Sequence, residues 1–382
     1  MKTVGIICEY NPFHLGHKKQ FDIIRSHFEQ DTAIICLMSG NFVQRGAPAV
    51  FDKSLRAQAA ILSGADLVLE LPVTYALSSA EGFAAGGVKI LSGFCDALCF
   101  GTESGDRDSL MQTAQELLST DFSEKLRVQL DKGLSFPAAR AAALGDDSLL
   151  RNPNDILAVE YCKAILAQNS PMDIFPIRRE GNYHDDTPDP ENPSATSLRN
   201  RIIDGTDWLS YIPAEAQAAL ENAPIHTLAA GQRAILARLR TMADTEFEAL
   251  PYGSEGLWRK LMHACRDSAT LDEIITKTKS KRYTRTRIDR MILCAFLGIT
   301  ADDMASPASY ARVLGFTDAG RTLLKKARQA GLFPHTGDIV DDAYQALETR
   351  CDDLYGLFAT QEPETAGITS KRRVYIHKNA GC

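Results

Sequence analysis

The chain has 382 residues, of which 45% are hydrophobic and 24% are charged, a balance typical of a globular protein with two domains. Its formal net charge of −7 argues against a protein that coats nucleic acid with its whole surface, but it leaves room for a local basic patch. No apolar stretch approaches the roughly 20 residues that span a bilayer. Glu9 interrupts the first apolar run, so we expect no signal peptide, no membrane partner and a cytoplasmic location.

Short β-branched runs alternate with amphipathic stretches along the first half of the chain. We expect buried strands at residues 4–8, 33–38, 67–71, 97–100 and 172–177. We expect helices at residues 16–28, 52–63 and 79–91. This alternation predicts an α/β fold, that is, a Rossmann-like domain with a parallel sheet. In such sheets, ligands bind beyond the carboxyl ends of the strands.

The second half of the chain has a different pattern. Residues 185–193 are polar and rich in proline, which predicts a surface loop, and a new helix is expected to be capped at residues 194–196. After about residue 207 the strand patterns fade. Helices are expected at residues 231–242, 253–266, 283–297 and 341–358. We therefore expect a catalytic α/β domain over residues 1–206 and a mainly α-helical domain over residues 207–382.

Two histidines follow the first expected strand, in the run from Glu9 to His17. The run joins a strand, through a turn with proline, to a helix that starts near Gly16. The start of this helix offers free backbone N–H groups and the positive end of the helix dipole, and both favour binding of an anion. His14 and His17 are three residues apart, so both point to the same side of the first helical turn. Both imidazoles can donate hydrogen bonds to a triphosphate and stabilise departing pyrophosphate. Two surface histidines at a helix start are the alternative interpretation.

The spacing His14-x-Gly16-His17 resembles the HxGH signature of the nucleotidyltransferase superfamily, whose members cleave ATP between its α and β phosphates. A second motif of that superfamily grips the outer phosphates, and residues 194–199 fit it in type and position. Hydroxyls at a helix start and a planar guanidinium suit phosphate, although capped helices with an arginine are common. The candidate catalytic residues are His14, His17, Ser194, Thr196, Ser197 and Arg199.

Further motifs narrow the resemblance. In chain order they lie at residues 39–46, 100–103, 153–157, 178–179, 183–185 and 281–290. Together with the two phosphate motifs, they make the chain similar to the bacterial tRNA(Met) cytidine acetate ligase family from Val4 to about Leu297. The resemblance implies that acetate and ATP give acetyl-adenylate and pyrophosphate. It also implies that the acetyl group then moves to N4 of the wobble cytidine of elongator tRNA(Met), which gives N4-acetylcytidine.

The same resemblance implies an ATP site, with Mg²⁺ accompanying the nucleotide. Asp155 and Arg179 depart from the family pattern, which has asparagine and an aliphatic residue there, so either of the paired arginines can meet the nucleotide. A helix cap and a structural ion pair are the alternative roles of Asn154 and Arg178. The nucleotide-binding residues that the resemblance implies are Ile7, Cys8, Glu9, Tyr10, Asn11, Pro12, Phe13, His14, Leu15, Gly16, His17, Lys18, Lys19, Gln20, Gly101, Asn154, Arg178 and Arg179.

Four polar residues follow the second expected strand, so they are also expected to face the cleft. We propose them as contacts to acetate or cytidine, with a structural role in the loop as the alternative. They are Ser39, Asn41, Gln44 and Arg45.

A basic run lies in the helical half, between residues 277 and 290, where seven basic residues accompany one acidic residue. Lysines and arginines there can meet RNA phosphates, and a tyrosine can stack on an unpaired base. A solvated helix face is the alternative. The residues expected to bind tRNA are Lys277, Lys279, Lys281, Arg282, Tyr283, Arg285, Arg287 and Arg290. A DNA partner is not expected.

Two other functions stay open on the sequence alone. A small-molecule nucleotidyltransferase would explain the α/β domain but not the basic run. A non-catalytic RNA-binding protein with structural ATP would not need both His14 and His17. No metal site is expected, because Cys95 and Cys99 lack the CxxC spacing of a zinc site and no second pair accompanies them.

Overall fold

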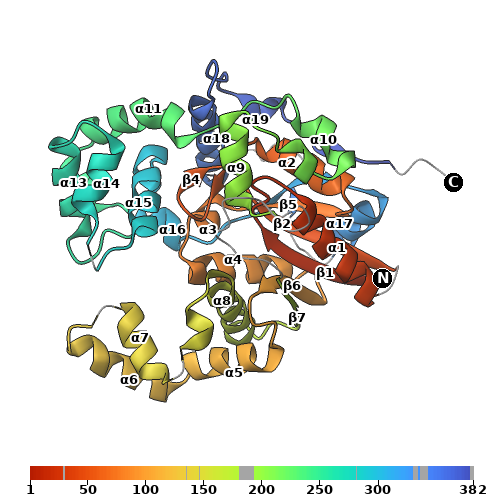
Figure 1. The fold of residues 1–382 in the computed structure, drawn as a ribbon, viewed down its shortest axis with the longest axis horizontal. Coiled ribbons are helices and arrows are strands. Elements are labelled where there is room, and N and C mark those ends of the chain that lie inside the picture. The colour runs from red at the N-terminus through yellow and green to blue at the C-terminus, as the bar shows by residue number, and fades with distance from the viewer. Residues whose placement is uncertain are drawn as a thin grey trace.

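The computed structural model describes residues 1–28, 31–134, 136–145, 147–179, 193–280, 282–329, 334–335 and 343–378. An α/β core carries a helical lobe on one side (Figure 1). The strands are β1 (Lys2–Cys8), β2 (Thr32–Ser39), β3 (Phe42–Val43), β4 (Ala47–Pro48), β5 (Leu67–Leu71), β6 (Ala97–Thr102), β7 (Asp173–Arg178), β8 (Ala311–Phe316), β9 (Pro334–His335) and β10 (Tyr375–Ile376).

Eight α-helices are described in the first half of the chain, and three of them lie close to the ranges predicted from the sequence, residues 16–28, 52–63 and 79–91. The eight helices are α1 (Leu15–Phe28), α2 (Lys53–Leu62), α3 (Val73–Ala76), α4 (Ala80–Leu91), α5 (Arg107–Leu117), α6 (Thr120–Asp131), α7 (Phe136–Leu144) and α8 (Pro153–Ala167). Those of the second half are α9 (Ala195–Asp204), α10 (Ala214–Leu220), α11 (Leu228–Thr241), α12 (Asp244–Glu248), α13 (Leu257–Arg266), α14 (Leu271–Thr278), α15 (Arg285–Leu297), α16 (Ala301–Ala305), α17 (Asp318–Gln329), α18 (Ala343–Tyr355) and α19 (Ile368–Lys371).

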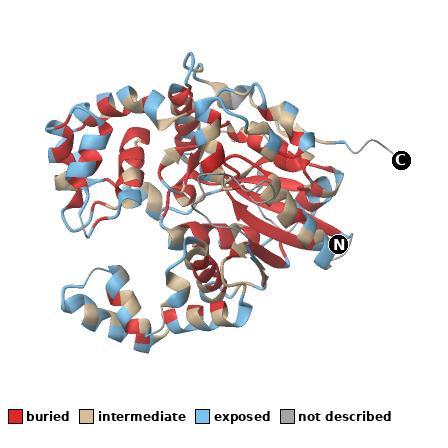
Figure 2. Ribbon diagram, viewed as in Figure 1, coloured by how far each residue is buried: buried red, intermediate tan, exposed pale blue. Residues whose placement is uncertain are grey.

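The main sheet has the order β10-β8-β5-β2-β1-β6-β7, with β9 paired to β8. Within the run β5-β2-β1-β6-β7, every neighbouring pair of strands is parallel, which confirms the parallel sheet predicted from the sequence. Every residue of β2 is buried, as a central strand covered on both faces should be. One face is covered by α4, α5 and α8, and the other by α1, α2 and α10. Figure 2 shows the buried residues concentrated in the strands and on the inner sides of these helices.

A separate apolar cluster holds the helical lobe together. It joins side chains of α11, α13, α14, α15 and α18. The four helices expected at residues 231–242, 253–266, 283–297 and 341–358 are therefore present, with ends that differ by a few residues. Among the described helices, none is long and apolar enough to cross a membrane. The expected proline-rich loop lies at residues 185–192, outside the described residues, and only Pro193 of it is described.

Three described strands of the second half, β8, β9 and β10, join the main sheet, which the sequence pattern did not indicate. β8 pairs antiparallel to β5, and β10 pairs with β8. The arginine within β8, Arg312, interrupts its apolar pattern, but it is largely buried beside Glu70 and Glu348, with N···O distances of 3.6 and 3.7 Å. The segment after residue 206 is thus mainly helical but also completes the sheet, and the division at residue 206 stays a prediction.

Candidate active site

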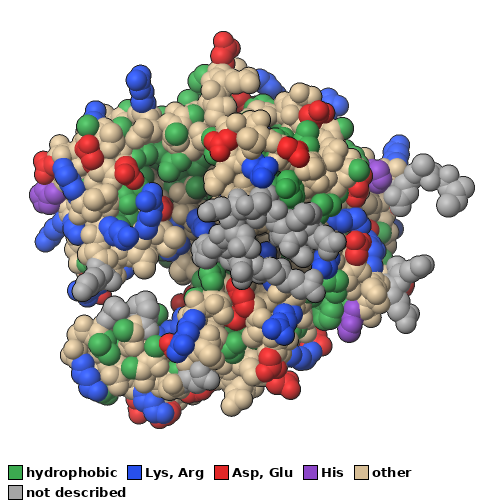
Figure 3. Space-filling model, viewed as in Figure 1, with side chains coloured by type: hydrophobic (Ala, Val, Ile, Leu, Met, Phe, Trp, Pro, Cys, Tyr) green, Lys and Arg blue, Asp and Glu red, His purple; other side chains and the backbone are tan. Residues whose placement is uncertain are grey.

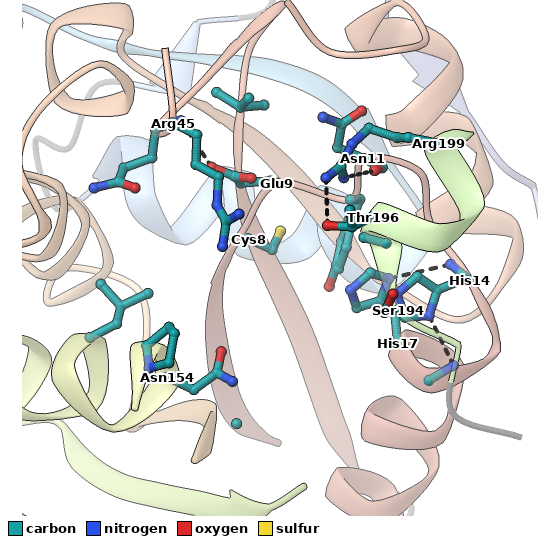
Figure 4. Close-up of a pocket in the computed structure, with 18 of the residues that line it drawn as sticks. Cys8, Glu9, Asn11, His14, His17, Arg45, Asn154, Ser194, Thr196 and Arg199 are labelled. Atoms are coloured by element: carbon teal, nitrogen blue, oxygen red, sulfur yellow. Dashed lines mark hydrogen bonds between the residues drawn. The ribbon is translucent and has the colours of Figure 1, made fainter. Parts of the chain in front are cut away.

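A cavity of about 590 Å³ opens at the carboxyl ends of β1, β6 and β7. Its wall is formed by the loop from β1 into α1, the starts of α8, α9 and α11, and the short hairpin of β3 and β4. Figure 4 shows the side chains of these separate elements converging on one space. The position agrees with the general rule for open parallel sheets.

The two histidines of the first motif are stacked on each other in the cavity wall. Their ring centroids are 3.7 Å apart, with 27° between the ring planes. The backbone N–H of Gly16 donates to Nδ1 of His14 at 3.1 Å, and the N–H of His14 donates to Nδ1 of His17 at 3.3 Å. Because each Nδ1 accepts, each neutral ring carries its proton on Nε2, which is therefore a donor.

Both imidazoles are held in the neutral form. Burial, reinforced by the charges of Arg179 and Arg199, lowers the pKa of His14 to about 3. Burial, then His14 and Arg179, lowers the pKa of His17 well below its ordinary value. Two neutral N–H donors among arginines form a site that favours an anion without a need for protonation.

The start of α9 brings the second motif to the same wall. Ser194 caps the helix, and its hydroxyl accepts from the N–H of Ser197 at 3.1 Å. The guanidinium of Arg199 donates to the carbonyl of Asn11 at 2.8 Å and to the hydroxyl of Thr196 at 2.9 Å, which fixes it beside the β1–α1 loop (Figure 4). The positive ends of α1 and α9 thus meet at one cavity.

Five of the six candidate catalytic residues line the cavity, and Ser197 does not. Its side chain is buried, it lies outside the cavity wall, and its hydroxyl donates to the carbonyl of Ser194 at 2.9 Å. The proposed phosphate contact of Ser197 is therefore wrong for this arrangement, because its hydroxyl completes the helix cap. Ser194, Thr196 and Arg199 remain in the wall.

Most of the residues in the first loop line the cavity, but four do not. Phe13 is fully buried and packs against Tyr10 and Phe21, with ring centroids 4.8 and 5.5 Å away, because it anchors the loop to the core. Lys18 pairs instead with Asp22 at 2.6 Å. The residues of the expected nucleotide loop outside the wall are Pro12, Phe13, Leu15 and Lys18.

Gly101, Asn154 and the paired arginines also line the cavity. A Cβ atom at Gly101 would lie 3.0 Å from Cδ of Arg179, so glycine lets the arginine side chain pass close to β6. Arg178 packs toward Gly105, whereas the charge of Arg179 acts on both histidines. The departure from the family pattern at residue 179 thus adds positive charge beside the histidines.

Several comparisons with known proteins agree with this geometry. A model of the HIGH Nucleotidyl Transferase family matches residues 1–369. The tRNA(Met) cytidine acetate ligase of Clostridium novyi is 35% identical, with 87% of this chain and 89% of that protein covered. The same ligase of Thermosipho melanesiensis is 36% identical, with 87% and 84% covered. The chain belongs to this ligase family.

Solved structures of Thermotoga maritima TmcAL have the same fold. The form bound with alpha-thio ATP is 29% identical and has a TM-score of 0.88, with 99% of this chain and 100% of that chain covered. The apo form is 30% identical and has a TM-score of 0.90, with the same coverage. The α/β architecture with its helical lobe is therefore common to this chain and TmcAL.

The four candidates for substrate contact divide into two pairs. Gln44 and Arg45 lie in the cavity wall, on the β3–β4 hairpin. Ser39 is fully buried outside the wall. Asn41 is also buried, and its amide donates to Asp352 at 3.0 Å and accepts from the backbone N–H of Lys53 at 2.8 Å. The substrate roles proposed for Ser39 and Asn41 are wrong for this structure, because both side chains face the core.

The basic run is only partly a surface feature. Tyr283 is 8% exposed and donates its hydroxyl to the carbonyl of Glu255, so its ring is not available to stack on a base. Arg290, also 8% exposed, lies 5.2 Å from the centroid of the Tyr252 ring and donates to the carbonyl of Gln44. Both proposed RNA contacts are thus contradicted by burial.

The remaining members of the run have different surroundings. Arg287 is half-buried and donates to the carbonyl of Tyr252 at 2.7 Å. Lys281 lies outside the described residues. Figure 3 shows Lys and Arg side chains on the surface of the helical lobe. The exposed members of the run are Lys277, Lys279, Arg282 and Arg285.

Sequence reasoning missed the apolar part of the cavity wall. Phe83 of α4 and Leu157 and Tyr161 of α8 line it. An apolar residue on a helix carries no sequence signal that separates a cavity wall from an ordinary core. Among the described residues, no group of three or more His, Cys, Asp or Glu side chains is arranged to hold a metal ion.

Proposed function

We propose that this protein uses ATP to activate acetate and transfers the acetyl group to N4 of the wobble cytidine of elongator tRNA(Met). The observation that carries the proposal is the convergence of two neutral imidazoles and the Arg199 guanidinium at the positive ends of α1 and α9. Donors so placed suit the outer phosphates of ATP. The ligase relatives and the TmcAL structure with alpha-thio ATP support the same reaction.

In the first step, an acetate oxygen attacks the α-phosphorus of ATP, and the bond to the bridging oxygen of pyrophosphate breaks. Negative charge then grows on the leaving pyrophosphate. His14 and His17 each offer an Nε2–H, and Arg199 offers a charged donor, so this charge is stabilised where it forms. Mg²⁺ that accompanies ATP would sit on phosphate oxygens, since it prefers oxygen ligands and keeps several waters.

In the second step, the N4 amine of cytidine attacks the acetyl carbonyl, AMP leaves, and the amine loses one proton. Gln44 and Arg45 lie on the cavity side that faces the helical lobe, because the hairpin carrying them contacts α15 through Arg290. We therefore assign acetate and cytidine to this side. The exposed basic residues of the lobe would bind tRNA phosphates. We propose a cytoplasmic location, because ATP and tRNA would both be substrates.

The test is mass spectrometry of nucleosides from unmodified elongator tRNA(Met) after incubation with ATP and isotopically labelled acetate. We expect labelled N4-acetylcytidine only when protein, ATP and acetate are all present. A tRNA without a wobble cytidine serves as the control substrate. Protein that binds ATP but forms no labelled nucleoside would contradict the proposal.

A further inference from the structure

Two acidic side chains lock the turn after β6 to the first turn of α8. Asp155 accepts hydrogen bonds from the backbone N–H groups of Glu103 at 2.9 Å and Ser104 at 3.1 Å, and from the Thr102 hydroxyl. The Glu103 carboxylate in turn accepts a hydrogen bond from the backbone N–H of Asp155 at 2.8 Å, so the two segments are bonded reciprocally. Carboxylates at a helix start are favoured by its free N–H groups and its dipole.

The second oxygen of Glu103 holds the side chain of Asn154. The Asn154 Nδ2 donates to Oε1 of Glu103 at 2.7 Å. A carboxylate can only accept, so this contact requires the NH₂ end of the amide. The carbonyl end, Oδ1, is consequently turned away from Glu103. Asn154 lies in the cavity wall and its side chain is directed into the cavity in Figure 4, while Glu103 itself lies outside the wall.

The start of α8 therefore differs from the starts of α1 and α9. Its first residue, Pro153, has no N–H, and the N–H groups of Asn154 and Asp155 both point to Glu103, at 3.4 and 2.8 Å. These donors are already engaged by a carboxylate, which disfavours a phosphate here. An Oδ1 acceptor instead suits a hydrogen-bond donor of the ligand. ATP has such donors in its ribose hydroxyls and its adenine amine.

We propose that Glu103 is a positioning residue for the nucleotide: it fixes the amide of Asn154 so that Oδ1 accepts a hydrogen bond from the nucleoside part of ATP. The inference deepens the proposed function, because it takes ATP as the ligand. Glu103 acts only through Asn154 and does not touch the nucleotide.

The test replaces Glu103→Gln, which keeps the shape but leaves one accepting oxygen where the wild type has two. Either the Asp155 N–H or the Asn154 amide then loses its acceptor, and the amide can turn over. We expect about tenfold weaker ATP binding by calorimetry, from the loss of one hydrogen bond, with kcat within about threefold of wild type. Glu116→Gln, an exposed position on α5, is the matched control and should bind ATP normally.

A thermodynamic cycle separates positioning from a merely structural cap. Asn154→Ala should weaken ATP binding about as much as Glu103→Gln, and the double variant should bind no more weakly than Asn154→Ala alone. If Glu103→Gln proves unfolded, unchanged ATP affinity in Asn154→Ala would still overturn the inference, because this variant removes the acceptor Oδ1 and leaves the Glu103 contact with the Asp155 N–H intact. Independent, additive losses from the two substitutions would overturn the inference.

Nucleotide analogues identify the ligand donor. If Oδ1 accepts from a ribose hydroxyl, 2′-deoxy-ATP or 3′-deoxy-ATP should bind equally to the wild type and Glu103→Gln. If Oδ1 accepts from the adenine amine, ITP, which lacks that amine, should bind equally to the wild type and Glu103→Gln. Equal losses for all of these nucleotides in the variant, or no loss for ATP, would refute the proposal. Wild-type protein that binds ATP but makes no N4-acetylcytidine would instead refute the proposed function and leave this inference standing.

Discussion

The substitution of His17 tests the chemistry of the site most sharply. His17 contributes one Nε2–H donor to the charge that develops on pyrophosphate, while His14 and Arg199 still contribute theirs. Loss of one such donor typically costs about 10²- to 10³-fold in rate, or about 2.7–4 kcal/mol. We therefore expect His17→Ala to reduce acetate-dependent exchange of pyrophosphate into ATP by that factor while ATP binding changes much less.

Two further variants make this prediction specific. His17→Gln places an amide N–H near the position of Nε2 and should recover part of the rate, whereas His17→Asn restores only an acceptor near Nδ1 and should not. His27→Ala is the matched control, because His27 lies on the same helix but stacks on Phe175 at 4.4 Å, outside the cavity wall. Equal rates for His17→Ala and wild type, or equal losses for His17→Ala and His27→Ala, would refute the reasoning.

Three other predictions concern stability and RNA binding. Burial lowers the pKa of His14 from 6.5 to about 3, so the unfolded state binds this proton first as the pH falls. The contribution of His14 to stability should therefore decrease below pH 6.5, by about 2 kcal/mol at pH 5. In urea unfolding, His14→Gln should reduce this pH dependence but not abolish it, because the lowered pKa of His17 remains. Lys53 is buried between Glu70 and Asp352, at 2.6 and 2.7 Å, so Lys53→Met should cost about 3–5 kcal/mol in the same assay; a loss below 1 kcal/mol would contradict this. In filter binding, Arg285→Ala should weaken tRNA binding and reduce the slope of log affinity against log salt concentration by about one, while the thermal stability stays normal. Arg290→Ala, at a buried position, should instead lower the thermal stability. The reverse pattern would show that the assignment of the basic run is wrong.

The strands that build the site were predictable because their sequences carry a local signal. β1, β2, β5 and β6 are short apolar runs that are almost wholly buried, and such runs are recognisable without knowledge of their partners. The edge strand β7 is only partly buried, but it has the same short apolar pattern. β8 escaped prediction because Arg312 breaks its apolar run, and that arginine is acceptable only beside carboxylates brought by β5 and α18. Its ion pairs join segments distant in the chain, which no local pattern reports.

The same reasoning explains which site residues were predictable. His14 and His17 follow from a motif in which spacing alone places both rings on one side of a helix. Asn41 looked equally plausible as a polar residue after a strand, but its amide is bound by Asp352, 311 positions away in the chain. Tyr283 and Arg290 likewise carry RNA-binding chemistry, yet apolar packing of the lobe buries them. Tertiary partners thus decide which polar residues reach the cavity or the surface.

A crystal structure of this protein with a non-hydrolysable ATP analogue would test the central claim most directly. We expect oxygens of the β or γ phosphate within about 2.7–3.2 Å of Nε2 of His14 or His17 and of the Arg199 guanidinium, with the nucleoside toward Gly101 and Asn154. An analogue bound in the reverse direction, with its triphosphate beside Asn154 and its base against the histidines, would contradict the account.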